Sequence, residues 1–275
     1  MLENLFRLDG KVIVITGASG LLGSKHAEAV ACYGGIPILI DLYQEDVNNL
    51  ANKLNSKYNT NAAGFACDIT NEDAVKINAE LLVKKYGKID GLVNNAANNP
   101  KVEDNNNLNF SRLENFPLDI WNDDIRVGLT GSFLCSKHYG QKISKNINGG
   151  SIVNISSDLG LIAPDQRLYK IDNVEKNLQN VKPLTYSVIK SGLIGLTRYL
   201  STYWIEEGVR CNAMCPGGIE NGQSEYFLEK VSSRIPMNRL ASPNEYQGTL
   251  IWMLSDASSY LNGAIIAVDG GRTSW

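Results

Sequence analysis

The chain has 275 residues, 43% of them hydrophobic and 20% charged, so an ordinary globular fold is expected, and one α/β domain would account for the length. Its formal net charge of −3 argues against nucleic-acid and anionic-membrane partners, because both need clustered Lys and Arg. The chain contains no run of 18 apolar residues, so no membrane span is expected, and its charged start does not resemble a signal peptide.

Short apolar runs alternate along the chain with longer stretches of mixed polarity. The apolar runs predict strands at 11–16, 36–41, 62–67, 89–93, 151–156, 209–215 and 265–268. The mixed stretches predict helices at 24–33, 44–58, 72–86, 121–147 and 186–207. This alternation implies a doubly wound parallel sheet with helices on both faces, a three-layer α/β/α domain over residues 1–275. The asparagine-rich stretch 98–109 and the polar stretch 165–182 are expected to be loops.

A glycine-rich turn, Thr16-Gly-Ala-Ser-Gly-Leu-Leu-Gly23, joins the first strand to the first helix. A pyrophosphate needs glycines and free helix amides at this point of a Rossmann fold. Gly17 permits the tight turn, Gly20 lets backbone approach the phosphates, and Gly23 allows close packing of the helix. An ordinary glycine-rich turn is the alternative, but the position at the chain start favours a dinucleotide site.

Two carboxylates follow strands near this turn. Asp41 ends the second predicted strand, where it can accept both ribose hydroxyls of NAD and repel the 2′-phosphate of NADP. NAD is therefore the expected cofactor, although Asp41 could instead cap the following helix. Asp68 follows the third strand and could bind the adenine amine or cap the helix that begins at Glu72.

Tyr186 and Lys190 are four residues apart on a predicted helix, so their side chains share one face. A lysine ammonium beside a phenol is expected to lower the tyrosine pKa and make it an acid or base near neutral pH. Ser157 follows the fifth strand, at the edge of the sheet where ligands bind. Its hydroxyl could hold a carbonyl or carbinol oxygen beside the tyrosine.

Seven segments in order resemble the short-chain dehydrogenase/reductase family. They are Thr16 to Gly23, Asp68, Asp90-Gly-Leu-Val-Asn-Asn-Ala-Ala97, Ile152 to Ser157, Tyr186 to Lys190, Arg210-Cys-Asn-Ala-Met-Cys-Pro-Gly217 and Val268-Asp-Gly-Gly271. The resemblance implies that Tyr186 is the acid/base, that Ser157 orients substrate, and that Lys190 binds the nicotinamide ribose. It implies that Asn95 and Ala96 lie along the cofactor and that Ile219 contacts the carboxamide. Further implied cofactor contacts are Ser19, Leu21, Leu22, Ile69, Pro216 and Gly217, and the implied assembly is a homotetramer or homodimer.

The sequence departs from the family pattern at three places. Leu21 stands where single-domain members usually have their middle glycine. Gly128 stands where the family often has an asparagine that positions a water for proton relay, so the helix distortion would persist without the amide. Ser157 and Tyr186 are separated by the extra segment 165–182, which carries Arg167, Tyr169, Lys170, Lys176 and Lys182. That segment could be a lid that meets an anionic sugar or phosphate, a solvated insertion, or a subunit contact.

Cysteine and histidine usage argues against a metal site. The five cysteines are an odd number without a Cys-x-x-Cys pair, so reduced thiols in the cytoplasm are expected. His26 and His138, the two histidines of the chain, lie on predicted helices and are expected to have structural or surface roles.

The sequence thus predicts an NAD-dependent enzyme that moves a hydride to or from a polar alcohol or ketone, such as a sugar. A looser resemblance links the chain to bacterial flagellin-modification and legionaminic-type sugar pathways. It is carried by Asp158-Leu-Gly-Leu-Ile-Ala-Pro-Asp-Gln-Arg-Leu-Tyr169, Leu196-Thr-Arg-Tyr199 and Gly270-Gly-Arg-Thr-Ser-Trp275. Two alternatives stay open: an NAD-assisted sugar epimerase or dehydratase, and a non-catalytic NAD-binding regulator or scaffold.

Overall fold

The computed structural model describes residues 4–98 and 111–275, and seven parallel strands form its sheet in the order β3-β2-β1-β4-β5-β6-β7. The predicted doubly wound sheet is therefore confirmed. The strands are β1 (Val12–Thr16), β2 (Ile36–Asp41), β3 (Ala63–Ala66), β4 (Gly91–Asn94), β5 (Gly150–Ile155), β6 (Val209–Pro216) and β7 (Ile265–Val268). The strand order reverses between β1 and β4, which opens a crevice at their carboxyl ends.

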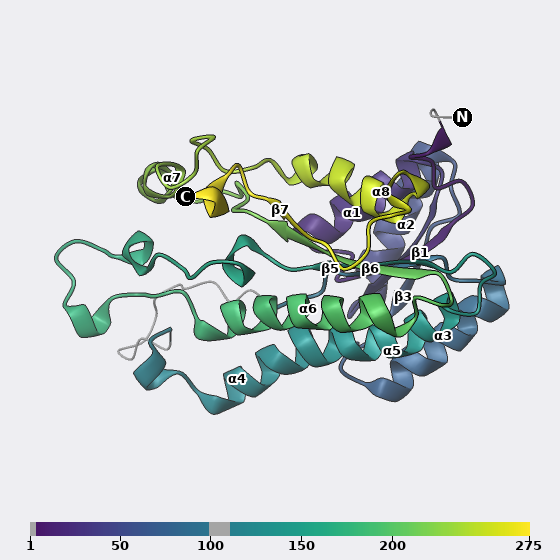
Figure 1. The fold of residues 1–275 in the computed structure, drawn as a ribbon. Coiled ribbons are helices and arrows are strands. Elements are labelled where there is room, and N and C mark those ends of the chain that lie inside the picture. Colours follow the sequence, from purple (N-terminus) through teal and green to yellow (C-terminus); the bar gives the residue numbers. More distant parts are fainter. Residues whose placement is uncertain (1–3, 99–110) are drawn as a thin grey trace.

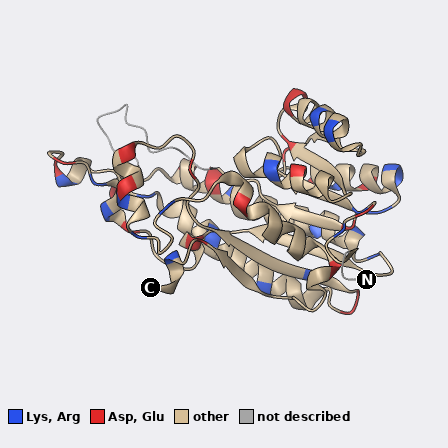
Figure 2. Ribbon diagram, turned by 90° about the horizontal axis from the view of Figure 1, so that it is seen from above, with Lys and Arg blue, Asp and Glu red and all other residues tan. Residues whose placement is uncertain are grey.

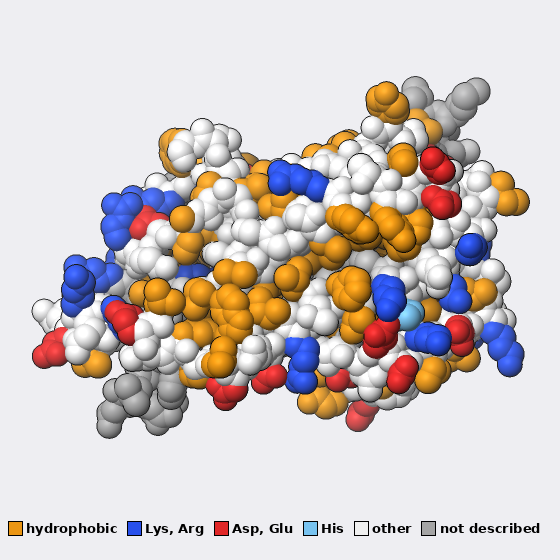
Figure 3. Space-filling view, turned by 60° about the horizontal axis from the view of Figure 1, so that its bottom comes forward, with side chains coloured by type: hydrophobic (Ala, Val, Ile, Leu, Met, Phe, Trp, Pro, Cys, Tyr) orange, Lys and Arg blue, Asp and Glu red, His pale blue; other side chains and the backbone are white. Residues whose placement is uncertain are grey.

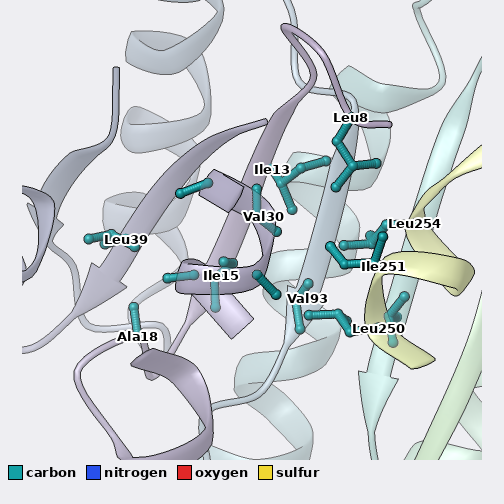
Figure 4. Close-up of a cluster of buried hydrophobic side chains, with 14 of the residues drawn as sticks. Leu8, Ile13, Ile15, Ala18, Val30, Leu39, Val93, Leu250, Ile251 and Leu254 are labelled. Atoms are coloured by element: carbon teal, nitrogen blue, oxygen red, sulfur yellow. The ribbon is translucent and has the colours of Figure 1, made fainter. Parts of the chain in front are cut away.

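Helices cover both faces of the sheet, as expected for buried parallel strands (Figure 1). One face carries α1 (Leu21–Cys32), α2 (Gln44–Tyr58) and α8 (Gln247–Leu254), and the other carries α3 (Glu72–Tyr86), α5 (Gly131–Ile143) and α6 (Leu184–Tyr203). Figure 4 shows the first core, where Ile13, Ile15 and Val93 meet side chains of α1 and α8. A second core of similar composition joins α3, α5 and α6 to the opposite face.

The predicted helix over 121–147 is interrupted. It consists of α4 (Leu118–Ile125), a π-helical segment at Arg126–Thr130, and α5, which ends at Ile143. Gly128 lies buried in the π segment, and a Cβ added there would stand 2.6 Å from Cγ2 of Ile189 on α6. The expected local distortion is therefore present, and π-bulges of this kind are frequent at functional sites.

The extra segment 165–182 is more ordered than a plain loop. It contains two 3₁₀ turns, Gln166–Tyr169 and Lys176–Leu178, and packs against α7 (Glu225–Ser232), a helix that the sequence did not predict. A small third core holds the two together, and its buried members are Leu168, Val231, Ile235 and Leu240, with Tyr169, Phe227 and Leu228 at its edge. The insertion and the segment that follows β6 therefore pack together around this third core.

The remaining expectations from composition concern charge, cysteine and histidine. Acidic and basic residues are interspersed along the described part of the chain (Figure 2). All five cysteines are unpaired, and none of the described helices is both long and apolar enough to cross a bilayer. His26 is fully buried, and burial lowers its pKa to about 4, whereas His138 lies 3.1 Å from Glu72. These positions are compatible with the structural or surface roles expected of the two histidines.

Candidate active site

Hydrogen bonds join the glycine turn to the residues that follow β4. The Thr16 hydroxyl accepts hydrogen bonds from the amides of Asn95 at 3.0 Å and Ala96 at 3.1 Å. The Asn95 side-chain amide donates to the carbonyls of Thr16 at 2.9 Å and Gly17 at 3.1 Å. Asn95 therefore fixes the shape of the turn at the point where the strand order reverses.

The three glycines of the turn lie where a side chain would clash with the backbone or would cover the exposed backbone of the turn. Gly17 has a φ of +62°, and a Cβ there would lie 2.8 Å from Ala96 Cα. A Cβ on Gly23 would lie 2.0 Å from the Gly17 carbonyl oxygen, so only glycine lets α1 pack so closely. Gly20 is the N-cap of α1, which begins at Leu21, three residues before the predicted start. Its backbone is exposed at the turn, as an approaching phosphate requires.

A cavity of about 470 Å³ opens beside this turn. Its lining includes seven of the predicted cofactor residues: Gly17, Ser19, Gly20, Asp41, Asp68, Ile69 and Ala96. It also includes residues that the sequence did not single out, among them Thr70, Ala97, Arg126 and Val127. The other predicted cofactor residues lie outside its lining: Leu21, Leu22, Gly23, Asn95, Tyr186, Lys190, Pro216, Gly217 and Ile219.

Asp41 and Asp68 are not helix caps. Tyr43 is the N-cap of α2, and the Asn71 side chain caps α3 by accepting from the Ala74 amide. Asp41 instead accepts from the Ser19 amide and the Leu42 amide, both at 2.8 Å, which holds its carboxylate at the mouth of the cavity. The capping alternatives are therefore wrong for both carboxylates.

The cavity fits the phosphate and ribose part of a dinucleotide. The Ser19 hydroxyl oxygen is buried and has no hydrogen-bond partner among the described residues, so it is available to a phosphate oxygen. Asp41 could accept ribose hydroxyls, and the first amides of α1 face the same turn. These residues suit the pyrophosphate and ribose of the dinucleotide that the glycine turn predicts.

The proposed catalytic side chains come together at the carboxyl end of β5. Tyr186 and Lys190 lie on one face of α6, with the lysine Nζ 5.6 Å from the centroid of the tyrosine ring. Lys190 donates to the Ile155 carbonyl at 2.8 Å, and its own carbonyl accepts from the Ser156 hydroxyl at 2.7 Å. Ser157 follows directly and interacts with Tyr186 through its hydroxyl.

The expected lowering of the Tyr186 pKa is wrong for the chain on its own. Burial raises this pKa above its usual value, an interaction with the Ser157 hydroxyl lowers it, and the charge of Asp158 raises it. Burial also lowers the pKa of Lys190 to about 8, because its ammonium is enclosed by protein. The Lys190 ammonium donates one of its three hydrogens to the Ile155 carbonyl and lies 5.6 Å from the centroid of the Tyr186 ring, and burial of the phenol outweighs its effect.

A buried ion pair adjoins the serine and was not foreseen from the sequence. Asp158 Oδ2 lies 3.0 Å from the Arg272 guanidinium, and the two side chains are 4% and 10% exposed. Asp158 Oδ1 accepts from the Ser157 hydroxyl and the Leu159 amide, both at 2.8 Å. Burial nevertheless raises the pKa of Asp158. The Asp158 carboxylate orients the Ser157 hydroxyl, and the Arg272 guanidinium near the C-terminus balances the charge of this carboxylate.

Lys182 also belongs to this site. It ends the insertion, and its Nζ lies 4.0 Å from the centroid of the Tyr186 ring, nearer than that of Lys190. Tyr169 from the same insertion is close enough to Tyr186 for their charges to interact, and burial raises the Tyr169 pKa to about 12. The insertion therefore contributes side chains directly beside Tyr186, the predicted acid/base.

The last predicted cofactor residues lie at the ends of β6 and β7. Pro216 ends β6, and the Gly217 amide donates to the Val268 carbonyl at 2.9 Å. Gly217 lines a separate cavity of about 150 Å³, and Ile219 pairs in parallel with Ala241. These positions are compatible with the nicotinamide contacts that the resemblance implies, which stay predictions.

Known proteins resemble the chain over nearly its whole length. The family model described as Enoyl-(Acyl carrier protein) reductase matches residues 17–273. D-threitol dehydrogenase of Mycolicibacterium smegmatis is 30% identical over 98% of this chain and 95% of its own. A 3-oxoacyl-[acyl-carrier-protein] reductase of Aquifex aeolicus is 31% identical, covering 96% of this chain and 98% of its own. Post-translational flagellin modification protein A of Campylobacter coli is 28% identical, with coverages of 96% and 98%.

Solved structures agree with this relationship. A short-chain type dehydrogenase/reductase from Mycobacterium marinum superposes with a TM-score of 0.84 at 26% identity, covering 99% of each chain. A gluconate 5-dehydrogenase from Burkholderia cenocepacia, in complex with NADP and tartrate, gives a TM-score of 0.87 at 25% identity over 100% of each chain. Together with the family model and the gathered Ser157, Tyr186 and Lys190, these matches establish that the chain belongs to the short-chain dehydrogenase/reductase family of oxidoreductases, which act on alcohols and ketones.

Proposed function

We propose that the protein is an NAD-dependent dehydrogenase or reductase of a polyhydroxylated alcohol or ketone, a sugar or sugar derivative. The observation that carries this proposal is the meeting of Ser157, Tyr186 and Lys190 at the end of β5, beside the crevice that holds the glycine turn. The test is an assay of the purified protein for a change in nicotinamide absorbance with polyols, sugar acids and the matching ketones. If none of these compounds is turned over, the proposal is contradicted.

The proton step follows from the positions of the side chains. Ser157 would hold the substrate oxygen, and Tyr186 Oη would take the hydroxyl proton in oxidation or return it in reduction. A bound nicotinamide would supply the hydride acceptor or donor. Lys190 would anchor the ribose with the donors that Ile155 leaves available. When the Ser157 hydroxyl turns to the substrate, Asp158 keeps the Leu159 amide and Arg272 as partners.

The rate should depend on pH differently for oxidation and for reduction. Oxidation needs the phenolate of Tyr186 and reduction needs its protonated form, and burial raises the pKa of this phenol. We therefore expect kcat for oxidation to rise from pH about 7 to about 9, because the small phenolate fraction grows with pH below the raised pKa. The kcat for reduction should stay level over this interval and fall only at higher pH, as the phenol ionises. Initial rates at saturating substrate measure both. An oxidation optimum below neutral pH would contradict the assignment of Tyr186 as the base.

NAD preference is proposed from the carboxylate of Asp41. Its position at the cavity mouth, fixed by the Ser19 amide at 2.8 Å, would set a negative charge against a 2′-phosphate. Asp41→Asn keeps a hydrogen-bond acceptor and removes the charge, so kcat/KM for NADP relative to NAD should rise about tenfold or more. Asp46→Asn, which changes an exposed acid on α2, is the matched control. Wild-type protein that uses NADP as well as NAD would refute the preference.

One panel of compounds can distinguish a polyhydroxylated substrate from a thioester-linked ketone. Relatives named for D-threitol and gluconate oxidation favour a polyhydroxylated substrate, whereas the relative named as a 3-oxoacyl-[acyl-carrier-protein] reductase favours a thioester-linked ketone. The flagellin-modification relative supports the narrower proposal of a bacterial surface-glycan or flagellin sugar. Sugars, polyols and an acetoacetyl thioester should be assayed side by side. Substrate turnover without net NADH change would instead favour the epimerase or dehydratase alternative.

We further propose a homodimer or homotetramer in the cytoplasm. Hydrophobic side chains gather on the face that carries α4, α5 and α6 (Figure 3), including the exposed Leu118, Phe133, Tyr199 and Tyr203. Apolar patches of this kind mark subunit contacts in soluble proteins. The five unpaired cysteines suit a reducing compartment. A solution mass of one 30.1 kDa chain would contradict the assembly.

A further inference from the structure

The single hydrogen of the Ser157 hydroxyl already has a partner within the chain. Ser157 Oγ donates it to Asp158 Oδ1 at 2.8 Å, and the same oxygen accepts from the Leu159 amide at 3.2 Å. A hydroxyl has one hydrogen to donate, so Ser157 can donate to a substrate oxygen only if this hydrogen leaves the carboxylate. Asp158 must then give up a charge-assisted hydrogen bond, which is one of the stronger kinds.

The Asp158 carboxylate is enclosed by protein, which makes the loss of a partner costly. Its side chain is 4% exposed, and burial raises its pKa although the charge of Arg272 and the Ser157 hydroxyl both oppose the rise. Without the serine, Oδ1 would keep the Leu159 amide at 2.8 Å, whereas Oδ2 accepts no well-aligned hydrogen bond from the residues that the structure describes. A buried carboxylate in this position needs a positive charge nearby to stay ionised.

Arg272 supplies this charge from the C-terminal turn. Its Nη1 lies 3.0 Å from Asp158 Oδ2, and its side chain is 10% exposed. Asp269 fixes the backbone of the turn, because its two carboxylate oxygens accept from the amides of Gly271 and Thr273, both at 2.9 Å. Both oxygens of Asp269 are thus used within the turn, and the Arg272 guanidinium pairs with Asp158.

We propose that Arg272 is a positioning residue of the active site, which balances the charge of Asp158 and so allows the Ser157 hydrogen to turn from the carboxylate to the substrate oxygen. The inference rests on the proposed function and adds to it a residue from a distant part of the chain. No covalent bond changes in this step, because the hydrogen stays on Ser157 Oγ and changes only its hydrogen-bond partner. The cation has a second effect during the reaction, since the substrate oxygen gains negative charge in the transition state beside the Asp158 carboxylate.

The test asks whether Arg272 acts through Ser157. The purified protein is assayed with xylitol, D-threitol, gluconate and the matching ketones, and the compound that the wild type turns over fastest is used for all variants. The variants are Arg272→Met, Arg272→Lys, Ser157→Ala and the double variant Ser157→Ala/Arg272→Met. Arg7→Met is the matched control, because it removes an arginine from an exposed ion pair with Asp9. KM and kcat are measured separately, and titration of intrinsic fluorescence with NADH gives the cofactor affinity.

We expect Arg272→Met to lower kcat/KM by about tenfold or more, with cofactor affinity changed less than about threefold because Arg272 does not line the cofactor cavity. In the Ser157→Ala background the same substitution should change kcat/KM less than about threefold. Arg272→Lys keeps a cation and should recover part of the loss, and Arg7→Met should match the wild type. A fall of equal size in both backgrounds would mean that Arg272 only supports the fold, and would overturn the inference.

A second comparison keeps the test decisive if Arg272→Met alone is too unstable to purify. Asp158→Asn removes the charge that Arg272 balances, so adding Arg272→Met to it should cost less than about threefold in kcat/KM. A tenfold cost in this background, or an unchanged kcat/KM in Arg272→Met alone, would overturn the inference. Inactivity of the wild type on every compound would instead contradict the proposed function, and the role of Arg272 would fall with it.

Discussion

Tyr186→Phe should lower kcat by about a thousandfold while cofactor affinity changes less than about threefold. The substitution removes the Oη that would exchange the substrate proton and keeps the ring, which lies 4.0 Å from Lys182 Nζ and 5.6 Å from Lys190 Nζ. Kinetics of nicotinamide absorbance give kcat, and titration of intrinsic fluorescence with NADH gives the affinity. Retained binding with lost turnover would assign the phenol to chemistry and not to assembly of the cofactor site.

Tyr139→Phe is the control for removing a buried phenolic hydroxyl. Tyr139 is fully buried on α5 and donates to Asn78 Oδ1 at 2.9 Å, within the core that joins α3 and α5. Its loss should lower the free energy of unfolding by about 1 kcal/mol and leave kcat within about twofold. A Tyr186→Phe protein that keeps more than a tenth of wild-type kcat would contradict general acid/base catalysis by Tyr186. Unchanged function of this variant in the cell, with turnover lost, would favour the scaffold alternative.

The sequence predicted the features that depend on neighbouring residues. A buried strand that runs into glycines, as at Thr16 and Gly17, places the turn at the carboxyl edge of the sheet without knowledge of other contacts. The spacing of Tyr186 and Lys190 likewise fixes their common helix face. Since parallel strands end at the same edge, Ser157 could be expected nearby. These local rules account for the correct sheet and for seven of the residues that line the cavity.

The features that were missed depend on residues far apart in the chain. The pair of Asp158 and Arg272 joins the end of β5 to the C-terminal turn. The third core joins Leu168 of the insertion to Val231 of α7. Lys182 was one of several lysines in a polar segment until the fold brought it over Tyr186. Periodicity contains no information about such contacts, so they could not be assigned in advance.

The sign of the Tyr186 pKa shift illustrates a second limit. A lysine four residues away predicts a lowered pKa only if its charge acts on the phenol more strongly than burial does. Here the ring is enclosed and Asp158 is nearby, so the net direction is upward. Composition and spacing do not report how completely a side chain loses contact with water. The net electrostatic effect therefore requires the folded geometry.

Restoring the family's asparagine at Gly128 should impair the enzyme. A Cβ at this position would lie 2.6 Å from Cγ2 and 3.1 Å from Cδ1 of Ile189, which precedes Lys190 in α6. Overpacking of this kind costs about 1–3 kcal/mol, and displacement of α6 would disturb Lys190. We expect Gly128→Asn to lower kcat/KM about tenfold or more and to lower the midpoint of thermal unfolding.

Two further variants separate the steric effect from the amide. Gly128→Ala should lower stability to a similar extent, because its Cβ meets the same methyl group. Combining Gly128→Asn with Ile189→Ala opens the space and should restore kcat/KM to within about threefold of the Ile189→Ala single variant. A higher kcat for Gly128→Asn alone would contradict this expectation and would mean that a missing relay amide limits the natural enzyme. The buried π segment at Arg126–Thr130 makes the opposite outcome the expected one, because Ile189 already fills the volume into which an asparagine Cβ would project.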